Sequence, residues 1–181
     1  MKKLKTMKKL FLLAAIALTL SCCNKDDDTT ESLPPATQTG AGTFACNVNG
    51  RAFIDTSGGY FNCFYQLVDG DYFFGIQGSD EIETLISVDI GTYNKEIFEN
   101  ETYQLIENIN GHAWGGGSFN PNNTSQEFST TNLQYKGELS ISKLDFTNNI
   151  VSGTFWFDLE NPYTNETVEI RNGRFDTLFT Q

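Results

Sequence analysis

The sequence predicts an all-β fold, a single antiparallel β-sandwich or flattened barrel, on three observations. Apolar and polar residues alternate with a period of two over many short runs, which is the pattern of half-buried strands. Asn-Gly and Asp-Gly pairs, which accept the positive φ angles of tight hairpin turns, separate several of these runs. Aromatic residues make up 13% of the chain, yet no long segment keeps the 3.6-residue period of a helix. Short strands joined by hairpins favour a sheet packed on itself.

The predicted strands share large apolar side chains at alternate positions. The clearest hairpin runs from Tyr60 to Val68, turns at Asp69-Gly70 and returns from Asp71 to Gly78. Residues 94–100 could form one or two helical turns. The other inward-facing sets, in chain order, are Phe44, Cys46 and Val48; Phe61, Cys63, Tyr65 and Leu67; Ile86, Val88 and Ile90; and Val151, Gly153, Phe155, Phe157 and Leu159. Further turn signals lie at Asn49-Gly50, Asn110-Gly111 and Asn172-Gly173.

The first residues specify export. Five lysines precede an apolar run from Leu10 to Leu20, which is about half of the roughly 20 residues that span a bilayer, so we expect a signal peptide over residues 1–22. The residues Leu20-Ser21-Cys22-Cys23 resemble a bacterial lipobox, in which Leu and two small residues precede a lipidated cysteine. Lipidation at Cys23 fits this pattern better, and Cys22 is the alternative.

The tail Asn24-Lys25-Asp26-Asp27-Asp28 is similar to the signal that sends Bacteroidota lipoproteins to the outer face of the outer membrane. The resemblance implies an outer-membrane lipoprotein of the cell envelope that faces outward. Residues 23–42 contain Leu33 as their only large apolar side chain, so they predict a lipid-anchored, disordered linker. Residues 43–181 have the size of one domain.

The charge balance limits the partners. Five of the 12 Lys and Arg residues lie in the signal, which leaves seven against 23 Asp and Glu. A chain this acidic repels phosphate backbones, so nucleic acid is excluded as a partner. The expected partners are the membrane, through the lipid anchor, and a small molecule or glycan.

The cysteines leave two alternatives. Once Cys23 is lipidated and Cys22 removed, Cys46 and Cys63 are the pair that remains in the domain. In an oxidising, exported setting they can form a disulfide, and the alternative is two buried free thiols. The chain has no Cys-x-x-Cys, a single His and no Asp-x-Asp-x-Asp-Gly calcium loop, so we expect no metal and no cofactor.

One short segment holds the candidate site residues. Any Ser-His-Asp or Cys-His arrangement would have to use His112, the single histidine, and no Gly-x-Ser-x-Gly elbow is present, so we expect no catalytic residues and no enzyme. Trp114 follows His112 and precedes three glycines. Glycines leave an indole face uncovered, so Trp114, with His112 nearby, could be a platform that stacks on a sugar or another flat ligand. The alternative is a Trp that closes one end of the core.

Three segments carry a further resemblance. Cys46–Phe53, Val151–Phe155 and Val168–Asp176 resemble a family of small Bacteroidota lipoproteins with an all-β domain of unknown function. These segments are turns and strands, so the resemblance implies no active site. The function that we expect is a membrane-anchored, non-enzymatic binding or structural module of the envelope. The alternatives are a lipocalin-like carrier of an apolar ligand and a small glycan-binding or carbohydrate-active module.

Overall fold

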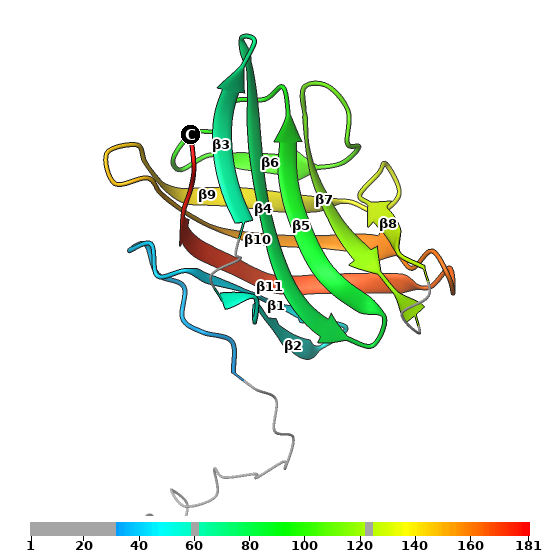
Figure 1. Cartoon of the computed structure of the whole chain (residues 1–181). Helices are drawn as coiled ribbons and strands as arrows, with labels where there is room; N and C mark the ends of the chain where they lie inside the picture. Colours follow the sequence, from blue (N-terminus) through cyan, green and yellow to red (C-terminus); the bar gives the residue numbers. More distant parts are fainter. Residues whose placement is uncertain (1–31, 59–61, 122–124) are drawn as a thin grey trace, which may run out of the picture. The chain divides into compact units, whose positions relative to one another are not determined.

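The computed structural model describes residues 32–58, 62–121 and 125–181 (Figure 1). Within these ranges the chain forms one sheet of eleven strands and no α-helix, which confirms the all-β prediction. Residues 94–100, for which helical turns were predicted, form a loop. The predicted signal peptide, Cys22 and Cys23 lie outside the described residues.

The strands vary from four to twelve residues in length. Their bounds are β1 Thr43–Val48, β2 Arg51–Ile54, β3 Asn62–Val68, β4 Asp71–Ile82, β5 Leu85–Tyr93, β6 Thr102–Leu105, β7 His112–Phe119, β8 Glu127–Thr130, β9 Gly137–Asp145, β10 Ile150–Glu160 and β11 Thr167–Leu178. They are ordered β2-β1-β11-β10-β9-β6-β7-β5-β4-β3, and β8 pairs with β7. The strand pairs are antiparallel except β6 with β7, which is parallel.

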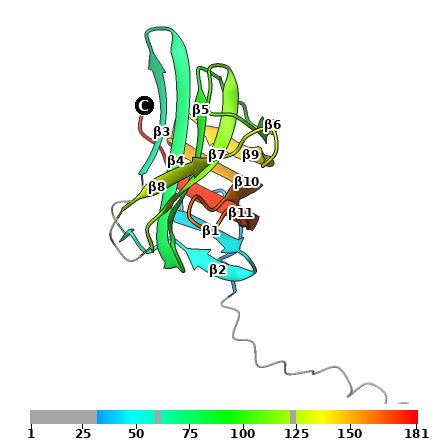
Figure 2. The same ribbon diagram turned by 90° about the vertical axis from the view of Figure 1, so that its right-hand side faces the viewer.

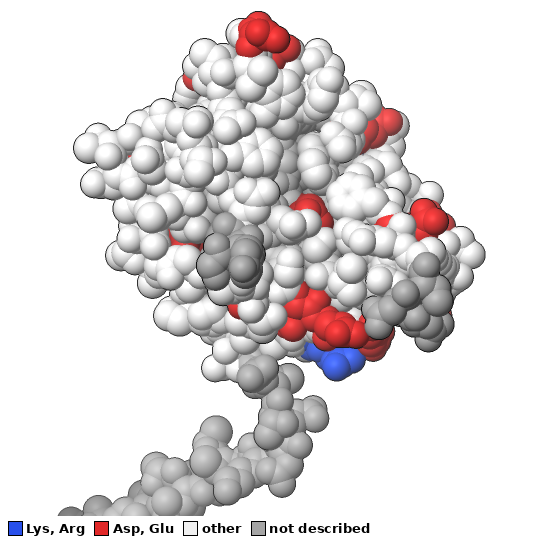
Figure 3. Space-filling view, in the orientation of Figure 1, with Lys and Arg blue, Asp and Glu red and all other residues white. Residues whose placement is uncertain are grey.

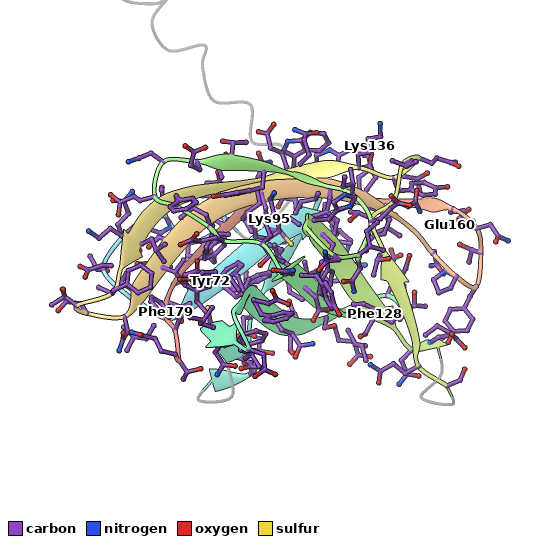
Figure 4. All side chains as sticks on the ribbon, turned by 90° about the horizontal axis from the view of Figure 1, so that it is seen from above. Tyr72, Lys95, Phe128, Lys136, Glu160 and Phe179 are labelled. Atoms are coloured by element: carbon purple, nitrogen blue, oxygen red, sulfur yellow. The ribbon has the colours of Figure 1, made fainter. Side chains whose placement is uncertain are left out.

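The sheet curls until its two halves face each other as a half-barrel. Strands β3, β4, β5 and β7 cross over β9, β10, β11 and β1 (Figures 1 and 2). Aromatic rings join the halves: Phe74 of β4 lies 6.2 Å from Phe175 of β11, measured between ring centroids. Side chains fill the space between the layers, as the view from above shows (Figure 4).

The predicted hairpin of β3 and β4 is confirmed, with pairs from Asn62–Gln77 to Val68–Asp71. Its turn residues Asp69 and Gly70 have φ angles of 53° and 95°. Leu67 was predicted to face the core and is 59% exposed, because the hairpin tip projects beyond the opposite layer (Figure 1).

The Asn172-Gly173 pair is a bulge rather than a turn. Both residues lie inside β11, where the pairing with β10 shifts between Phe155 and Phe157. Asn172 has a φ of 54°, so the residue type did signal a left-handed backbone. A bulge needs that conformation as much as a hairpin turn does, and the sequence prediction was wrong about its use.

The segment before β1 is docked on the fold, which corrects the predicted linker at its end. The carboxylate of Asp176, on β11, is buried and accepts hydrogen bonds from both the segment and β10. The donors are Thr37 Oγ1 at 2.6 Å, Thr39 N at 2.9 Å and Thr39 Oγ1 at 3.3 Å, Gly40 N at 2.7 Å, Ala41 N at 3.2 Å and Ser152 Oγ at 2.8 Å. Composition indicated disorder because it does not reveal a carboxylate that lies more than 130 residues away in the sequence.

Cys46 and Cys63 are both free and buried in the core. The structure therefore contains the second of the two alternatives, a pair of thiols packed as small hydrophobes. Burial raises the pKa of both thiols well above the ordinary value, so neither is poised to act as a nucleophile.

Candidate functional site

A groove of about 470 Å³ lies on the outer face of β3, β4, β5 and β7. This volume falls within the range of small-molecule sites. The same face carries few Lys and Arg side chains (Figure 3). The side chains of Asn62, Phe64, Gln66, Val68, Phe73, Gln77, Asp89, Tyr93, Asn108 and Trp114 are among those that line it.

The centre of the groove is a row of two glycines between two aromatic rings. Phe64, Gly75, Gly91 and Trp114 are successive cross-strand partners on β3, β4, β5 and β7. A Cβ atom on Gly75 would lie 2.5 Å from Cε1 of Phe64, and one on Gly91 would lie 2.7 Å from Cζ2 of Trp114. Each ring therefore packs directly over a glycine, and side chains at these two positions would displace the rings.

The neighbouring row is polar. Asn62, Gln77 and Asp89 are successive cross-strand partners on β3, β4 and β5. Gln77 Nε2 donates to Asp89 Oδ1 at 2.7 Å, and Ser87 Oγ donates to Oδ2 at 2.8 Å. Asp89 is 9% exposed. Burial raises its pKa, and the two hydrogen bonds offset this only in part, so the pKa stays above the ordinary value.

More aromatic rings border this arrangement. Phe73 and Tyr93 meet edge to face at 5.5 Å between ring centroids, and Trp114 meets Phe128 of β8 in the same way at 6.0 Å. Such contacts hold each ring in one orientation. Phe128 lies on the outer side of the sheet (Figure 4), so the indole of Trp114 is supported on the side away from Phe64.

The structure places the two predicted site residues differently. Trp114 lines the groove, on the outer face of β7, and does not close the end of the core. His112 pairs with Tyr93 at the start of β7 and is not a lining residue, and its Nδ1 is buried without a hydrogen-bond partner. Sequence analysis missed Phe64 and Asp89. The interruption of apolar alternation by Gly75 and Gly91 is the signal that could have indicated them.

A second groove, of about 520 Å³, lies on the outer face of the other layer around Trp156. The guanidinium of Arg171 lies over the Trp156 ring, 5.5 Å from its centroid. Arg171 also forms ion pairs with Asp158 at 2.6 Å and Glu169 at 3.1 Å. One guanidinium of the protein thus lies over this ring, which is still 42% exposed, and that guanidinium is itself paired with two carboxylates, whereas Asp89 forms no ion pair within the described residues. The groove beside Trp114 is therefore the stronger candidate.

The lining of the first groove offers aromatic rings, side-chain amides and one carboxylate. In the described part of the chain, no three His, Cys, Asp or Glu residues are placed to hold a metal ion. The lining contains one carboxylate, that of Asp89, whereas most glycoside hydrolases use two that flank the bond. The described residues also include no helix long and apolar enough to cross a membrane.

The family described as a domain of unknown function, DUF6252, matches residues 64–178. This range covers more than half of the sequence. The chain belongs to the DUF6252 family. The prediction of an all-β domain of unknown function is therefore confirmed. The matched range of the DUF6252 domain runs from within β3 to the end of β11 and includes Phe64, Asp89 and Trp114. No curated protein and no solved structure matches the chain.

Proposed function

We propose that this DUF6252 protein is a membrane-anchored, non-enzymatic module that binds a saccharide in the groove beside Trp114. The observation that carries the proposal is the pair of rings, Phe64 and Trp114, held over Gly75 and Gly91 next to a row of amide and carboxylate groups. Aromatic faces stack on the apolar faces of sugar rings. Amides and carboxylates accept and donate the hydrogen bonds that sugar hydroxyls need.

The packing of the interior supports an outer-face site over a lipocalin-like carrier. A carrier holds its ligand between the layers of a barrel. Here that space is occupied by large, fully buried or nearly buried side chains, including Phe74, Phe157 and Phe175. A ligand could enter only by displacing them, and closely packed cores do not yield at low cost.

The anchor is the second part of the proposal. The sequence features that support it are the short apolar run, the Leu20-Ser21-Cys22-Cys23 motif and the Lys-Asp-Asp tail that follows. We assign the lipid to Cys23 and place the protein on the outer face of the outer membrane of a Bacteroidota cell. One lipid chain gives only marginal membrane binding, so stable anchoring needs more than one acyl chain on this cysteine.

Titration of the purified full-length protein in detergent tests the ligand class. A panel of oligosaccharides is added while tryptophan fluorescence and calorimetric heat are followed. We expect Trp114→Ala to weaken binding at least tenfold. Trp156→Ala is the matched control, since it removes the other tryptophan from the opposite face, and we expect its affinity to equal that of the wild type. The same loss in both variants, or no binding by any oligosaccharide, would contradict the proposal.

Metabolic labelling with a clickable fatty acid tests the anchor in the producing cell. We expect Cys23→Ala to lose the label and Cys22→Ala to keep it. An impermeant biotin reagent should modify the protein on intact cells. A label that survives in Cys23→Ala, or biotinylation only after lysis, would refute the assignment of the lipid or of the outward orientation.

A further inference from the structure

Asp89 is the one charged side chain that lines the groove. The ion pairs formed within the described residues do not include it, and its two hydrogen-bond donors, Gln77 and Ser87, are both neutral. A carboxylate offers about four acceptor positions, so roughly half of its capacity remains unused. The structure therefore holds a buried negative charge without a counter-ion.

Such a charge is costly, and the fold does not explain it. Buried carboxylates are normally paired with a cation or bound to metal, because loss of hydration outweighs one or two neutral hydrogen bonds. The cross-strand partners of Asp89 are Gln77 and Gly116, the ring of Phe128 lies over Gly116, and none of these residues supplies a positive charge. A positively charged group of the ligand would compensate the carboxylate.

Trp114 lies close enough to Asp89 to contact the same positively charged group of the ligand. Its cross-strand partner on β5 is Gly91, two residues from Asp89 along the same face. Diagonal neighbours of this kind have Cα atoms about 7–8 Å apart. A cation bound between them would contact the carboxylate of Asp89 on one side and the indole face on the other, and ring faces attract cations.

The net charge of the whole molecule also favours a positively charged ligand. The chain has a formal net charge of −11, and the face with the groove shows scattered acidic side chains and almost no basic ones (Figure 3). Such a field raises the local concentration of cations and repels anions. Sugars with carboxylate or sulfate groups are therefore disfavoured.

We propose that the groove selects an amino sugar, whose ammonium group binds Asp89 while its ring stacks on Trp114. This inference rests on the proposed saccharide-binding function and specifies its substrate class. The polar row of Asn62 and Gln77 then faces the hydroxyl groups of the same or a neighbouring sugar unit.

Three oligosaccharides of equal length and linkage test the inference: β-1,4-linked glucosamine, N-acetylglucosamine and glucose. Binding to the full-length protein is measured by calorimetry at a pH at which the free amine is protonated. We expect the glucosamine oligomer to bind at least tenfold more tightly than the other two, and its affinity to fall as salt is added. In Asp89→Asn we expect its affinity to drop to that of the neutral oligomers.

Glu81→Gln is the matched control, because it removes one exposed carboxylate from β4 outside the groove. It should leave the preference for the amine unchanged. Near-ultraviolet circular dichroism and thermal unfolding show whether Asp89→Asn keeps its fold.

The possible failures are distinct. If the neutral oligomers bind as tightly as the amine and depend on Trp114, the selection of an amino sugar is wrong and the saccharide-binding function stands. If Asp89→Asn weakens all three oligomers equally, Asp89 does not recognise the amine and the inference is also wrong. If none of the three binds, both the inference and the proposed function fail on these probes.

Discussion

Two buried aspartates in this protein differ in the number of hydrogen-bond donors around their carboxylates. Asp176 is 1% exposed and accepts hydrogen bonds from the docked segment and from Ser152, which together outweigh the effect of burial and lower its pKa. Asp89 has two donors, and its pKa is raised. Each has one serine donor, so the difference lies in the Thr37 hydroxyl and the backbone N–H groups of Thr39, Gly40 and Ala41 around Asp176, where Asp89 has only the amide of Gln77.

The number of donors therefore distinguishes Asp176, whose carboxylate stabilises the fold, from Asp89, whose carboxylate can still bind a ligand. The fold stabilises the charged form of Asp176, which explains why a polar segment stays docked against β11. The fold destabilises the charged form of Asp89, so a gain in folding stability does not explain why an aspartate lies at this position. A group that costs stability inside a groove is a candidate for function.

The largest expected effect is the loss of the Asp176 carboxylate. Asp176→Ala leaves donors on Thr37, Thr39, Gly40 and Ser152 without their acceptor, and we expect the free energy of unfolding to fall by about 3 kcal/mol. Urea unfolding of the full-length protein measures it. Asp71→Ala, at the exposed hairpin turn, is the control and should change stability little. A loss below about 1 kcal/mol for Asp176→Ala would break the comparison.

The pH dependence of stability should follow Asp176. Because its pKa is lower in the folded than in the unfolded state, its contribution is complete above the unfolded value of about 4 and is lost as pH falls below it toward the folded value. The contribution at stake is on the order of 2 kcal/mol. Urea unfolding between neutral and acid pH should show a steeper loss for the wild type than for Asp176→Asn. Parallel curves would contradict this assignment.

The two serines give a matched pair. Ser152→Ala removes a donor from a carboxylate that the fold keeps charged, and we expect a loss of about 1.5 kcal/mol. Ser87→Ala removes a donor from Asp89, which can take up a proton more readily, so the expected loss is about half as large. Chemical denaturation of both variants at neutral pH measures the difference. Equal losses would mean that the two carboxylates are equivalent.

The smallest expected change is a gain. Asp89→Asn keeps an acceptor for Gln77 and removes a buried charge, so we expect the folded state to become about 1 kcal/mol more stable at neutral pH. The gain should vanish as pH falls, because protonation removes the charge from the wild type as well. Thermal unfolding at two pH values measures it. A marked loss of stability would show that Asp89 is structural and not held for a ligand.

What could be predicted from the sequence depended on local signals. The β3–β4 hairpin is encoded by adjacent alternation and the Asp69-Gly70 turn, so both strands and their register were predictable. The Asn172-Gly173 pair carried a correct backbone signal, but a bulge and a turn share it. Trp114 was identified because its glycine neighbours are consecutive in sequence.

The rest depends on contacts between distant segments. Phe64 and Trp114 lie in one row only through the pairing of β3 with β4, of β4 with β5 and of β5 with β7, and the last pairing skips over β6. The docked segment at Thr37 to Ala41 needs a carboxylate from the last strand. Neither the register of non-adjacent strands nor a long-range hydrogen bond leaves a periodic signal in one sequence.

The Asp176 contacts also determine how the domain bears mechanical load. A pull on the chain at its amino-terminal side reaches the hydrogen bond between Arg174 and the Pro34 carbonyl and then the Asp176 carboxylate before it reaches any strand. Strand β1 lies beyond them, bonded to β2 on one side and β11 on the other. We therefore expect the hydrogen bonds of Arg174 and Asp176 to break under load before those of any strand, so that the sheet and its groove stay intact.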